Sequence, residues 1–209
     1  MPKVWRTLPS GELEIAGVGV PVVSGAYEEL LQRVILKWGT LAETQAARTG
    51  VPPQWIVAFI AAESAGDAKA VSPAGATGLM QLMPPWWRGH TKDEIMQPEI
   101  NATIGCDLLA TIRKTQTPGP NGPELPKVAS SYNCGSDNAK NEPRIRPLNE
   151  WGMCEDKGYI TRVVAYSNWS YQHVERWRPK GKGPPVSSPV GLMMVIAGLY
   201  LLARWSRAF

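Results

Sequence analysis

The residue with the clearest chemical potential is Glu63, a single carboxylate at the end of an apolar stretch. The residues before it, 59–62, read FIAA, and Ala65 and Gly66 follow shortly after it. Apolar flanks remove water from a carboxyl group, which favours its protonated form, and a protonated Glu can donate to a leaving oxygen. The sequence therefore predicts an acid catalyst at Glu63. The alternative is a surface residue at a helix end, with residues 72–78 forming an ordinary turn.

The segment around Glu63 resembles a known family. The catalytic domain of soluble lytic transglycosylases, related to goose-type lysozyme, carries Glu-Ser at a helix end and then Ser-x-x-Gly-Ala-x-Gly-Leu-Met-Gln. Glu63-Ser64 and residues 72–81, SPAGATGLMQ, match this pattern in spacing and identity. Further on, residues 131–135, SYNCG, are similar to the family's Ala-Tyr-Asn-Ala-Gly, and residues 158–163, GYITRV, to its Tyr-Val-x-x-Val block. Four ordered motifs are more specific than one, and the likeness covers residues 27–177.

The resemblance implies a mainly α, lysozyme-like transglycosylase domain over residues 27–178 that acts on peptidoglycan glycan strands. Such an enzyme cleaves the β-1,4 bond between N-acetylmuramic acid and N-acetylglucosamine without hydrolysis and leaves 1,6-anhydromuramyl ends. One Glu serves as acid and then as base, helped by the substrate's 2-acetamido group. Most glycosidases use two carboxylates, but Asp67, Asp93 and Glu94 offer no dependable second one here.

The same resemblance assigns roles to other positions of the expected cleft. Ser72 and Gln81 would hydrogen-bond substrate amide or hydroxyl groups, and Tyr159 would orient Glu63 or stabilise charge near it. Tyr132 and Asn133 are expected to shape the cleft floor.

For several cleft residues a structural role is the competing interpretation. Tyr132 could instead be a core aromatic whose hydroxyl is satisfied. Met80 is either an apolar platform that faces the sugar or part of the core. One of Trp86 and Trp87 is expected to stack on a sugar ring. Gly75 and Gly78 are expected to supply positive φ rather than ligand contacts.

Cysteines and histidines are too few and too scattered for a metal or nucleophile site, so no metal or cofactor is expected. The chain has three cysteines and two histidines, with no CxxC. Cys134 stands where the family has Ala, and Cys154 lies across the loop that follows. A disulfide between these two would close that loop and would suit a protein outside the reducing cytosol. The alternative is three structural thiols.

Composition limits the range of functions. The chain has 209 residues, of which 44% are hydrophobic and 19% charged, which suits one domain with appendages rather than a disordered protein. The net charge of +4 would suit an anionic wall polymer or anionic lipid headgroups. No basic run is interleaved with aromatics, so nucleic acid is not an expected partner.

Apolar spacing predicts helices and no competing strand run. The expected helices cover residues 27–47, 53–63, 78–83, 100–114, 128–133 and 157–177. Residues 1–26 lack the continuous apolar core of a secretory signal. They are interpreted as an extended N-terminal arm that packs on the domain or on a partner, such as a virion membrane or capsid protein.

The last residues change character abruptly. Residues 179–189 are rich in Pro, Gly and basic side chains, which is typical of a linker, and residues 190–205 are then expected to form a C-terminal membrane anchor. The strictly apolar part, residues 190–203, is shorter than a bilayer core of about 30 Å. A helix buried against the catalytic domain is the alternative.

An anchor behind a wall-cutting domain favours a bacteriophage virion protein associated with an internal membrane, which opens the wall locally during genome entry. A wall-remodelling component of a conjugation or secretion apparatus in the bacterial cell envelope is the second interpretation. The third is a non-catalytic peptidoglycan-binding virion structural protein, although such a protein has no need of the acid.

Overall fold

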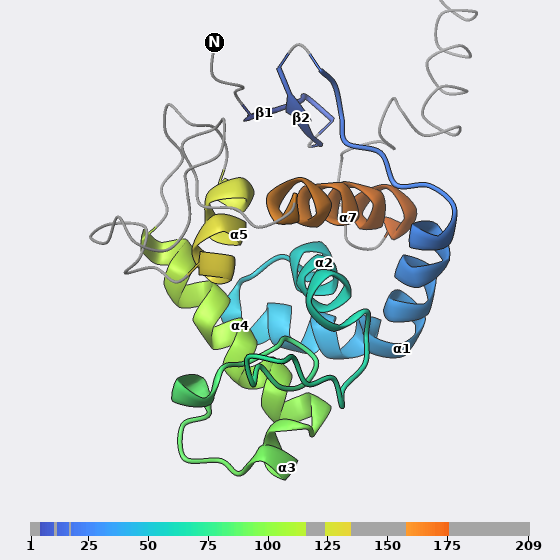
Figure 1. Cartoon of the computed structure of the whole chain (residues 1–209). Coiled ribbons are helices and arrows are strands. Elements are labelled where there is room, and N and C mark those ends of the chain that lie inside the picture. Colours follow the sequence, from blue (N-terminus) through green and yellow to red (C-terminus); the bar gives the residue numbers. More distant parts are fainter. Residues whose placement is uncertain (1–4, 11, 17, 116–123, 135–157, 176–209) are drawn as a thin grey trace, which may run out of the picture.

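The computed structural model describes residues 5–10, 12–16, 18–115, 124–134 and 158–175 (Figure 1). The described part is mainly helical, as predicted. Its elements are, in order, β1 (Trp5–Thr7), β2 (Leu13–Ile15), α1 (Ala26–Thr49), α2 (Pro53–Ser64), a 3-10 turn η1 (Pro84–Trp86), α3 (Lys92–Ile95), α4 (Pro98–Thr115), α5 (Glu124–Cys134) and α7 (Tyr159–His173).

Helix α2 lies at the centre of the domain, between α1 and α7 (Figure 1). Pro53 stands in its first turn, where a missing N–H costs nothing, and Ala65 ends it in the left-handed conformation. Residues 56–61 are all buried, as expected of a helix that is apolar on every face. Burial of a side chain such as Phe59 contributes about 2–3 kcal/mol. The end of α2, which carries Glu63, is therefore held by the core.

The N-terminal arm packs on the domain. Within it β1 and β2 form a short antiparallel hairpin in which Trp5 pairs with Ile15, a pairing that the sequence did not indicate. The buried Asn168 of α7 accepts from Leu13 N at 3.0 Å and donates to Leu13 O at 2.8 Å. Because one amide side chain satisfies both backbone groups of Leu13, the hairpin is fixed to α7.

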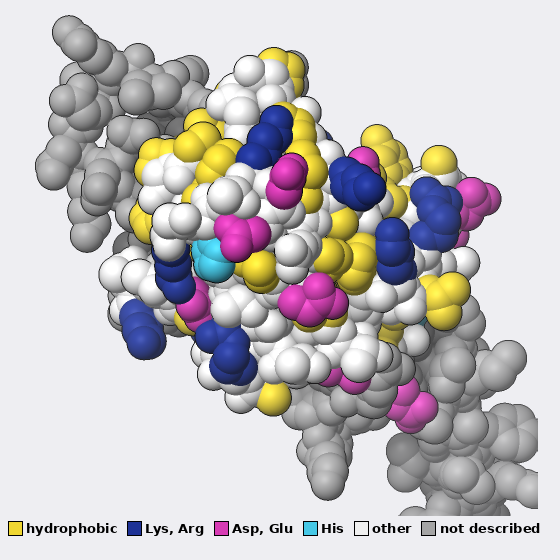
Figure 2. All heavy atoms as spheres, turned by 90° about the horizontal axis from the view of Figure 1, so that it is seen from below, with side chains coloured by type: hydrophobic (Ala, Val, Ile, Leu, Met, Phe, Trp, Pro, Cys, Tyr) yellow, Lys and Arg dark blue, Asp and Glu magenta, His cyan; other side chains and the backbone are white. Residues whose placement is uncertain are grey.

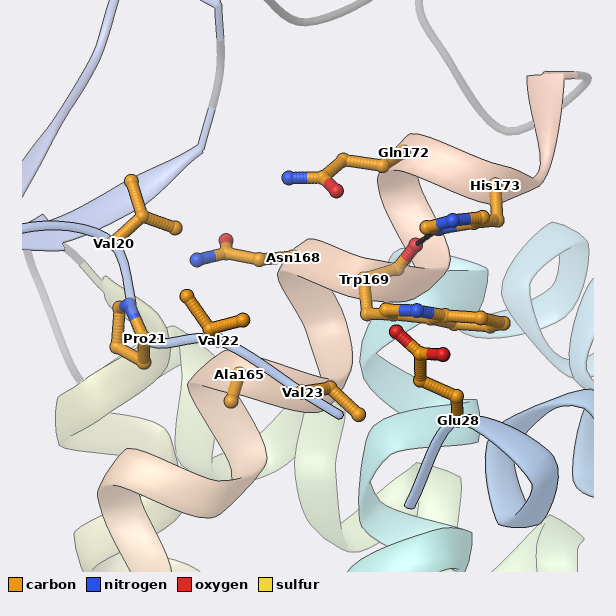
Figure 3. A pocket seen from close by; sticks show the side chains of 10 residues that line it. All are labelled: Val20, Pro21, Val22, Val23, Glu28, Ala165, Asn168, Trp169, Gln172 and His173. Carbon is orange, nitrogen blue, oxygen red and sulfur yellow. Dashed lines mark hydrogen bonds between the residues drawn. The ribbon is translucent and has the colours of Figure 1, made fainter. Parts of the chain in front are cut away.

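A small cavity of about 210 Å³ remains where the arm leaves the hairpin and passes over α7 (Figure 3). Trp169 and His173 of α7 stack in its wall, with ring centroids 4.0 Å apart. Glu28 of α1 and residues 20–23 of the arm face them. This cavity contains none of the predicted cleft residues.

The predicted helix over residues 78–83 is wrong. Thr77 and Leu82 exchange two backbone hydrogen bonds of 3.0 Å, and between them Gly78 and Gln81 adopt positive φ of 83° and 49°. A right-handed helix cannot contain such residues. The segment is a tight loop, and Gly75, at φ 88°, begins it. The expected positive φ of both Gly75 and Gly78 is confirmed.

The other predicted helices are confirmed with small differences in their ends. Helices α4 and α5 each begin before the expected residue, and α7 ends at His173 rather than at residue 177. Helix α3 was not predicted because it is a single turn, defined by a capping box between Thr91 and Glu94 rather than by apolar spacing.

Several predictions concern residues outside the described ranges. The predicted linker (residues 179–189) and anchor (residues 190–205) lie there, and among the residues that the structure does describe no helix could cross a membrane. Cys134 is disulfide-bonded, whereas Cys106 is a buried free thiol. The predicted partner, Cys154, also lies outside the described ranges.

Charges on the surface are mixed rather than segregated. Figure 2 shows one face of the molecule, on which Lys and Arg side chains are interspersed with Asp and Glu. Apolar side chains lie scattered among them. Mixed charges produce no strong long-range field on this face.

Candidate active site

A pocket of about 480 Å³ opens where the end of α2 meets the loop 70–81 and α7. Glu63 and Ser64 of α2, Ser72 and Gln81 of the loop, and Arg162 of α7 line it. The structure thus brings three of the predicted site residues, Glu63, Ser72 and Gln81, into one cavity. They come from the end of α2 and from the loop, two segments whose proximity the sequence indicated only through the spacing of its motifs.

The carboxyl group of Glu63 is poised between its two protonation states. Burial raises its pKa from 4.5 to about 7, although a hydrogen bond from Tyr159 and the charge of Arg162 both oppose this rise. The hydroxyl of Tyr159 donates to Glu63 Oε1, which agrees with the orienting role expected of this residue. Burial, and then the neighbouring charge of Glu63, hold the pKa of Tyr159 well above its usual range, so Tyr159 remains a donor. An acid with a pKa near neutrality is suited to proton transfer.

Ser64 attaches the end of α2 to the loop that follows. Its Oγ donates to Leu79 O at 2.7 Å and accepts from Gly66 N at 3.2 Å. Trp38 of α1 donates from Nε1 to Gly66 O at 2.9 Å. Because these bonds fix the chain on both sides of Ser64, they also fix the position of Glu63.

Asn101 of α4 holds the loop from beneath and was not predicted. It is completely buried, and its side chain accepts from Met80 N at 2.7 Å and donates to Thr77 O at 2.9 Å and Ile95 O at 3.0 Å. A Cβ on Gly78 would lie 2.2 Å from Asn101 Nδ2, so only glycine fits there. A single polar residue on an otherwise apolar helix face was the signal available in the sequence.

The two polar residues of the loop that line the pocket each keep a hydrogen-bonding group for a ligand. Gln81 donates from Nε2 to Ala70 O at 3.1 Å and Gly78 O at 3.0 Å, so its carbonyl oxygen remains available as an acceptor. Ser72 Oγ accepts from Ala76 N at 3.0 Å, and its proton remains available for donation. The pair therefore offers one acceptor and one donor beside Glu63.

Four of the predicted site residues do not line this pocket. Tyr159 is buried beside it and reaches it only through its hydrogen bond to Glu63. Met80 is completely buried in the core, which corrects the prediction that it faces a sugar and agrees with its core alternative. Tyr132 donates to Met80 O at 2.8 Å and packs on Phe59 with ring centroids 4.9 Å apart, which also agrees with its core alternative. Asn133 is half-buried on α5. Tyr132 and Met80 support the site from below rather than forming its surface.

Arg162 is a site residue that was not predicted from the sequence. It lines the pocket from α7, one helical turn after Tyr159, and its guanidinium carbon lies 5.7 Å from the centre of the Tyr159 ring. The sequence feature that could have indicated its position beside Tyr159 was the i, i+3 spacing of the two residues within GYITRV. Its positive charge stabilises the ionised form of Glu63.

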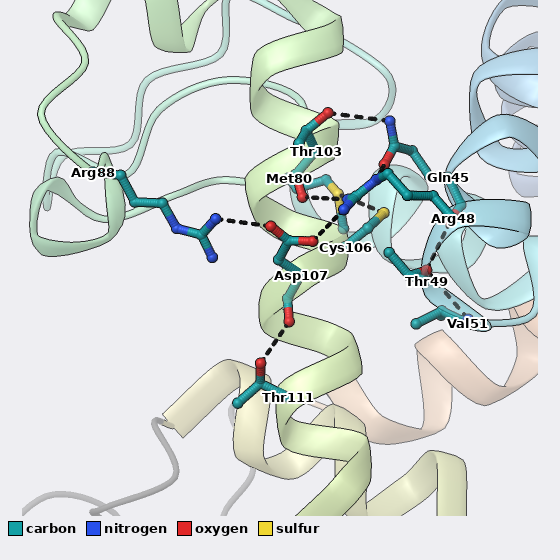
Figure 4. Close-up of polar contacts among 10 residues, drawn as sticks. All are labelled: Gln45, Arg48, Thr49, Val51, Met80, Arg88, Thr103, Cys106, Asp107 and Thr111. Atoms are coloured by element: carbon teal, nitrogen blue, oxygen red, sulfur yellow. Dashed lines mark hydrogen bonds and ion pairs between the residues drawn. The ribbon is translucent and has the colours of Figure 1, made fainter.

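The segment that follows the two tryptophans is tied to α4 by charge (Figure 4). Asp107 pairs with Arg88 at 2.8 Å and with Arg48 of α1 at 2.5 Å. Burial works against ionisation of Asp107, but the hydrogen bonds and charges of both arginines outweigh it and lower its pKa. The ion pairs therefore hold this part of the chain against the helices.

The two adjacent tryptophans differ in their surroundings. Trp87 donates from Nε1 to Leu82 O at 2.9 Å and packs on the small apolar cluster around Leu82. Trp86, in contrast, has 47% of its surface exposed. Trp86 is therefore the more accessible of the two, although neither tryptophan lines the pocket.

The remaining acidic candidates lie elsewhere. Asp67 is exposed and accepts from Lys69 N at 2.9 Å. Glu94 caps α3, and Asp93 is exposed beside it. Within the described ranges Glu63 is the only carboxylate that lines the pocket, and no group of His, Cys, Asp or Glu there could hold a metal ion. The arrangement can therefore supply one titratable acid with polar ligand contacts.

Comparison with known proteins gives a consistent assignment. The sequence model of the family described as "Transglycosylase SLT domain" matches residues 40–147. Proteins named endo-type membrane-bound lytic murein transglycosylase A, from Klebsiella pneumoniae subsp. pneumoniae and Salmonella paratyphi B, are 34% and 33% identical over 105 residues. Each match covers 45% of this chain and 52% of the relative, so the chain spans about half the length of these relatives.

The crystal structure of the 70 kDa soluble lytic transglycosylase from Escherichia coli has a similar fold. It superposes with a TM-score of 0.53 over 69% of this chain and 26% of that chain, at 24% sequence identity. Because the identity is low, this likeness supports the fold alone. The fold expected from the sequence, a lysozyme-like helical domain, is thereby confirmed.

Proposed function

The chain belongs to the transglycosylase SLT domain family, and on that premise we propose that it cleaves the β-1,4 bond between N-acetylmuramic acid and N-acetylglucosamine in peptidoglycan without hydrolysis. The observation that carries this proposal is the hydrogen-bonded pair of half-buried Glu63 and buried Tyr159, in which Glu63 has a pKa of about 7. The curated relatives, which are named murein transglycosylases, support the same chemistry.

The reaction begins with proton transfer. Glu63 donates its proton to the glycosidic oxygen as the bond between that oxygen and C1 of the muramyl residue breaks, and the electron pair of the bond stays on the oxygen. The carbonyl oxygen of the 2-acetamido group bonds to C1 and takes up the positive charge. Tyr159 and Arg162 stabilise the carboxylate that Glu63 has become.

The second step uses Glu63 as a base. It accepts the proton of the muramyl C6 hydroxyl, whose oxygen bonds to C1 and displaces the acetamido oxygen. The product has a 1,6-anhydromuramyl end, and no water is consumed. This route needs one carboxylate, in agreement with the single pocket carboxylate of the described residues. A two-carboxylate mechanism would need a partner for Glu63.

In this proposal the substrate is recognised by two hydrogen-bonding groups of the loop, one on Gln81 and one on Ser72. The carbonyl oxygen of Gln81 accepts from an acetamido N–H, and the hydroxyl of Ser72 donates to a carbonyl or hydroxyl oxygen. Both side chains are held in place by the backbone bonds described above, so little side-chain entropy is lost on binding.

Mass spectrometry of digested peptidoglycan tests the proposal. The protein should release muropeptides that end in 1,6-anhydromuramic acid, and the Glu63→Gln variant should release none while remaining folded. Reducing muramic ends would show that water attacks and would overturn the non-hydrolytic route. Binding to walls without any cleavage would favour the alternative of a non-catalytic virion structural protein.

We further propose that the enzyme works while tethered to a membrane. The apolar run at residues 190–203 and the membrane-bound character in the relatives' name support this. The full chain should partition with detergent, whereas a protein truncated after residue 179 should be soluble and should still cut walls. An unfolded, inactive truncated protein would show that the tail packs against the domain.

The biological setting follows from the same arrangement. A tethered wall-cutting domain suits a phage virion protein that opens the wall locally during genome entry, with a conjugation or secretion apparatus as the alternative. Proteomics of purified virions distinguishes the two, because only the first places this chain in the particle.

A further inference from the structure

The N-terminal arm is bonded to α7 at two buried positions. Asn168 of α7 is 4% exposed and forms hydrogen bonds with both backbone groups of Leu13. One turn further along the helix, Gln172 donates to the carboxylate of Glu12, which is 2% exposed. Figure 3 shows the side chains of Asn168 and Gln172 pointing from α7 toward the arm. The attachment therefore fixes the arm and the helix to each other by specific, directional bonds.

The arm is also held on the side away from these bonds. Trp5 and Ile15, which pair in the hairpin, are both buried in the main core. After Val23, another core residue, the chain enters α1, and α1 packs on α2. The arm therefore connects α7 to α2 through α1, by a route separate from the direct packing of α7 on α2.

The opposite side of α7 carries the two partners of the acid. With 3.6 residues per turn, Tyr159 and Arg162 lie on the side of the helix that faces away from Asn168 and Gln172. Tyr159 donates to Glu63, and Arg162 lines the active-site pocket. At 1.5 Å per residue, Asn168 is only about 9 Å along the axis from Arg162. Because the helix is continuous between them, a shift of α7 at Asn168 also moves both partners of Glu63.

The packing of α7 on the domain does not supply the same restraint. The family match, residues 40–147, includes Glu63 and the loop 70–81 but neither the arm nor α7. Helix α7 packs on α2 through the apolar side chains of Ile160, Val163 and Val164. Apolar packing is non-directional, whereas the bond from Tyr159 to Glu63 weakens steeply when its angle changes. The bonds of the arm therefore provide directional positioning where the acid requires it.

We propose that the N-terminal arm positions Tyr159 and Arg162 against Glu63, and that Asn168 and Gln172 are the positioning residues through which it acts. This inference rests on the proposed function. Neither Asn168 nor Gln172 lines the active-site pocket, so both act only through α7. Proton transfer by Glu63 then depends on a segment that precedes the matched part of the chain.

Release of the arm should change the titration of Glu63 in one direction. The titratable and charged groups that face Glu63 or line its pocket come from α1, α5 and α7, and they are Tyr27, Tyr132, Tyr159, Arg162 and Tyr166. Burial raises the pKa of Glu63 to about 7, and Tyr159 and Arg162 oppose this rise. A small shift of α7 breaks the directional bond of Tyr159, whereas the apolar contacts of the helix keep the carboxyl group away from water. The pKa of Glu63 should therefore rise further.

The test uses the full chain and two measurements. The first is a carbon-13 NMR titration of the Glu63 carboxyl group, whose signal is identified by its absence from Glu63→Gln. The second is the pH dependence of kcat on solubilised glycan strands. Asn168→Leu and Gln172→Met remove the bonds to the arm at similar side-chain volume. Each should raise the pKa of Glu63 by about one unit and lower kcat at neutral pH about tenfold.

Ile112→Ala is the matched control. Ile112 is buried on α4, a helix that contributes no residue to the pocket. Its truncation leaves a cavity in the core, so the melting temperature should fall as it does for Asn168→Leu. The pKa of Glu63 should nevertheless stay that of the wild type, because the attachment of the arm is intact.

Two results would overturn the positioning role. An unchanged pKa of Glu63 in both arm variants would show that the arm contributes stability alone, and a fall of the pKa toward 4.5 would show that the arm only keeps water out. If Asn168→Leu does not fold, Gln172→Met decides the question, since Gln172 is only half-buried. Failure of the proposed function gives a different result, because wild type would then leave the strands intact while the NMR titration still reports the pKa of Glu63.

Discussion

Replacement of Glu63 by Gln should remove activity and, at the same time, stabilise the protein at alkaline pH. Gln keeps the shape of the side chain and can accept the hydrogen bond from Tyr159, but it has no proton to transfer. Loss of a general acid lowers rates by about 10²–10⁴-fold or more. The stability effect arises because the protein no longer has to ionise a buried carboxyl group.

The magnitude follows from the pKa of Glu63. The unfolded chain releases this proton near 4.5, whereas the folded protein keeps it up to about 7. Between these values the folded state binds more protons, so the free energy of unfolding of the wild type falls as pH rises. At about 1.36 kcal/mol per pKa unit, the complete loss above pH 7 is about 3 kcal/mol. The Gln side chain of the variant does not titrate, so the variant escapes this loss.

Urea unfolding followed by tryptophan fluorescence measures the difference. At about pH 4 both proteins carry a largely neutral side chain and should unfold alike, whereas at pH 8 the variant should be more stable by about 2–3 kcal/mol. Glu29→Gln, on the exposed surface of α1, is the matched control and should change stability by less than about 0.5 kcal/mol. Parallel pH dependences of wild type and Glu63→Gln would refute the reasoning that burial raises the pKa of Glu63.

Three further predictions concern pH, the loop and the charge pair at α4. Initial rates on purified walls should fall as pH rises above about 7, because ionised Glu63 cannot donate; a rate that still rises from pH 7 to 9 would contradict this. Gly78→Ala should destabilise the domain by about 2–4 kcal/mol in thermal unfolding, since its Cβ would lie 2.2 Å from Asn101 Nδ2, whereas Gly75→Ala, with nothing within 4 Å, should cost only about 1 kcal/mol; equal effects would show that backbone strain alone decides. Asp107→Asn should cost about 1 kcal/mol at neutral pH, because ionised Asp107 pairs with two arginines in the folded protein; the difference should vanish in acid as the wild-type carboxyl group protonates, and a pH-independent difference would argue against the ion pairs.

The helices and the acid could be predicted because their signals are local. Apolar residues at three- and four-residue steps identify α1, and the continuous apolar run at residues 55–62, between two prolines and Glu63, identifies α2. The positions of Glu63, Ser72 and Gln81 followed from one continuous signature. In each case the decisive information lies within about 20 residues.

The loop after Gly78 was wrongly predicted because its determinant is remote. Leu79, Met80 and Leu82 are all buried, and their apolar run resembles a helix turn. What prevents a helix is Asn101, which lies on another element and replaces the helical hydrogen bonds with its own side chain. The spacing of hydrophobic residues predicts which side chains are buried. It does not predict which distant polar group forms hydrogen bonds with the backbone N–H and C=O groups of a segment.

The attachment of the N-terminal arm to α7 was missed for the same reason on a larger scale. The contact that sets the arm on α7 joins Leu13 to Asn168, which are 155 residues apart in sequence. Neither residue carries a signal that predicts the other. The arrangement of a cleft wall therefore depends on tertiary pairing, whereas the identity of the acid does not.

The environment of Glu63 shows why stability and activity oppose each other at this site. Burial at the end of α2 fixes the carboxyl group and raises its pKa to about 7, so it can act as an acid near neutral pH. The same burial penalises the carboxylate that must form in the first step, which Tyr159 and Arg162 then compensate. A more exposed Glu63 would ionise too readily to donate its proton, and a pocket without Tyr159 and Arg162 would hold the proton too tightly to release it. Proton transfer at this site therefore depends on the neutral donor Tyr159 and the cation Arg162 as well as on Glu63 itself.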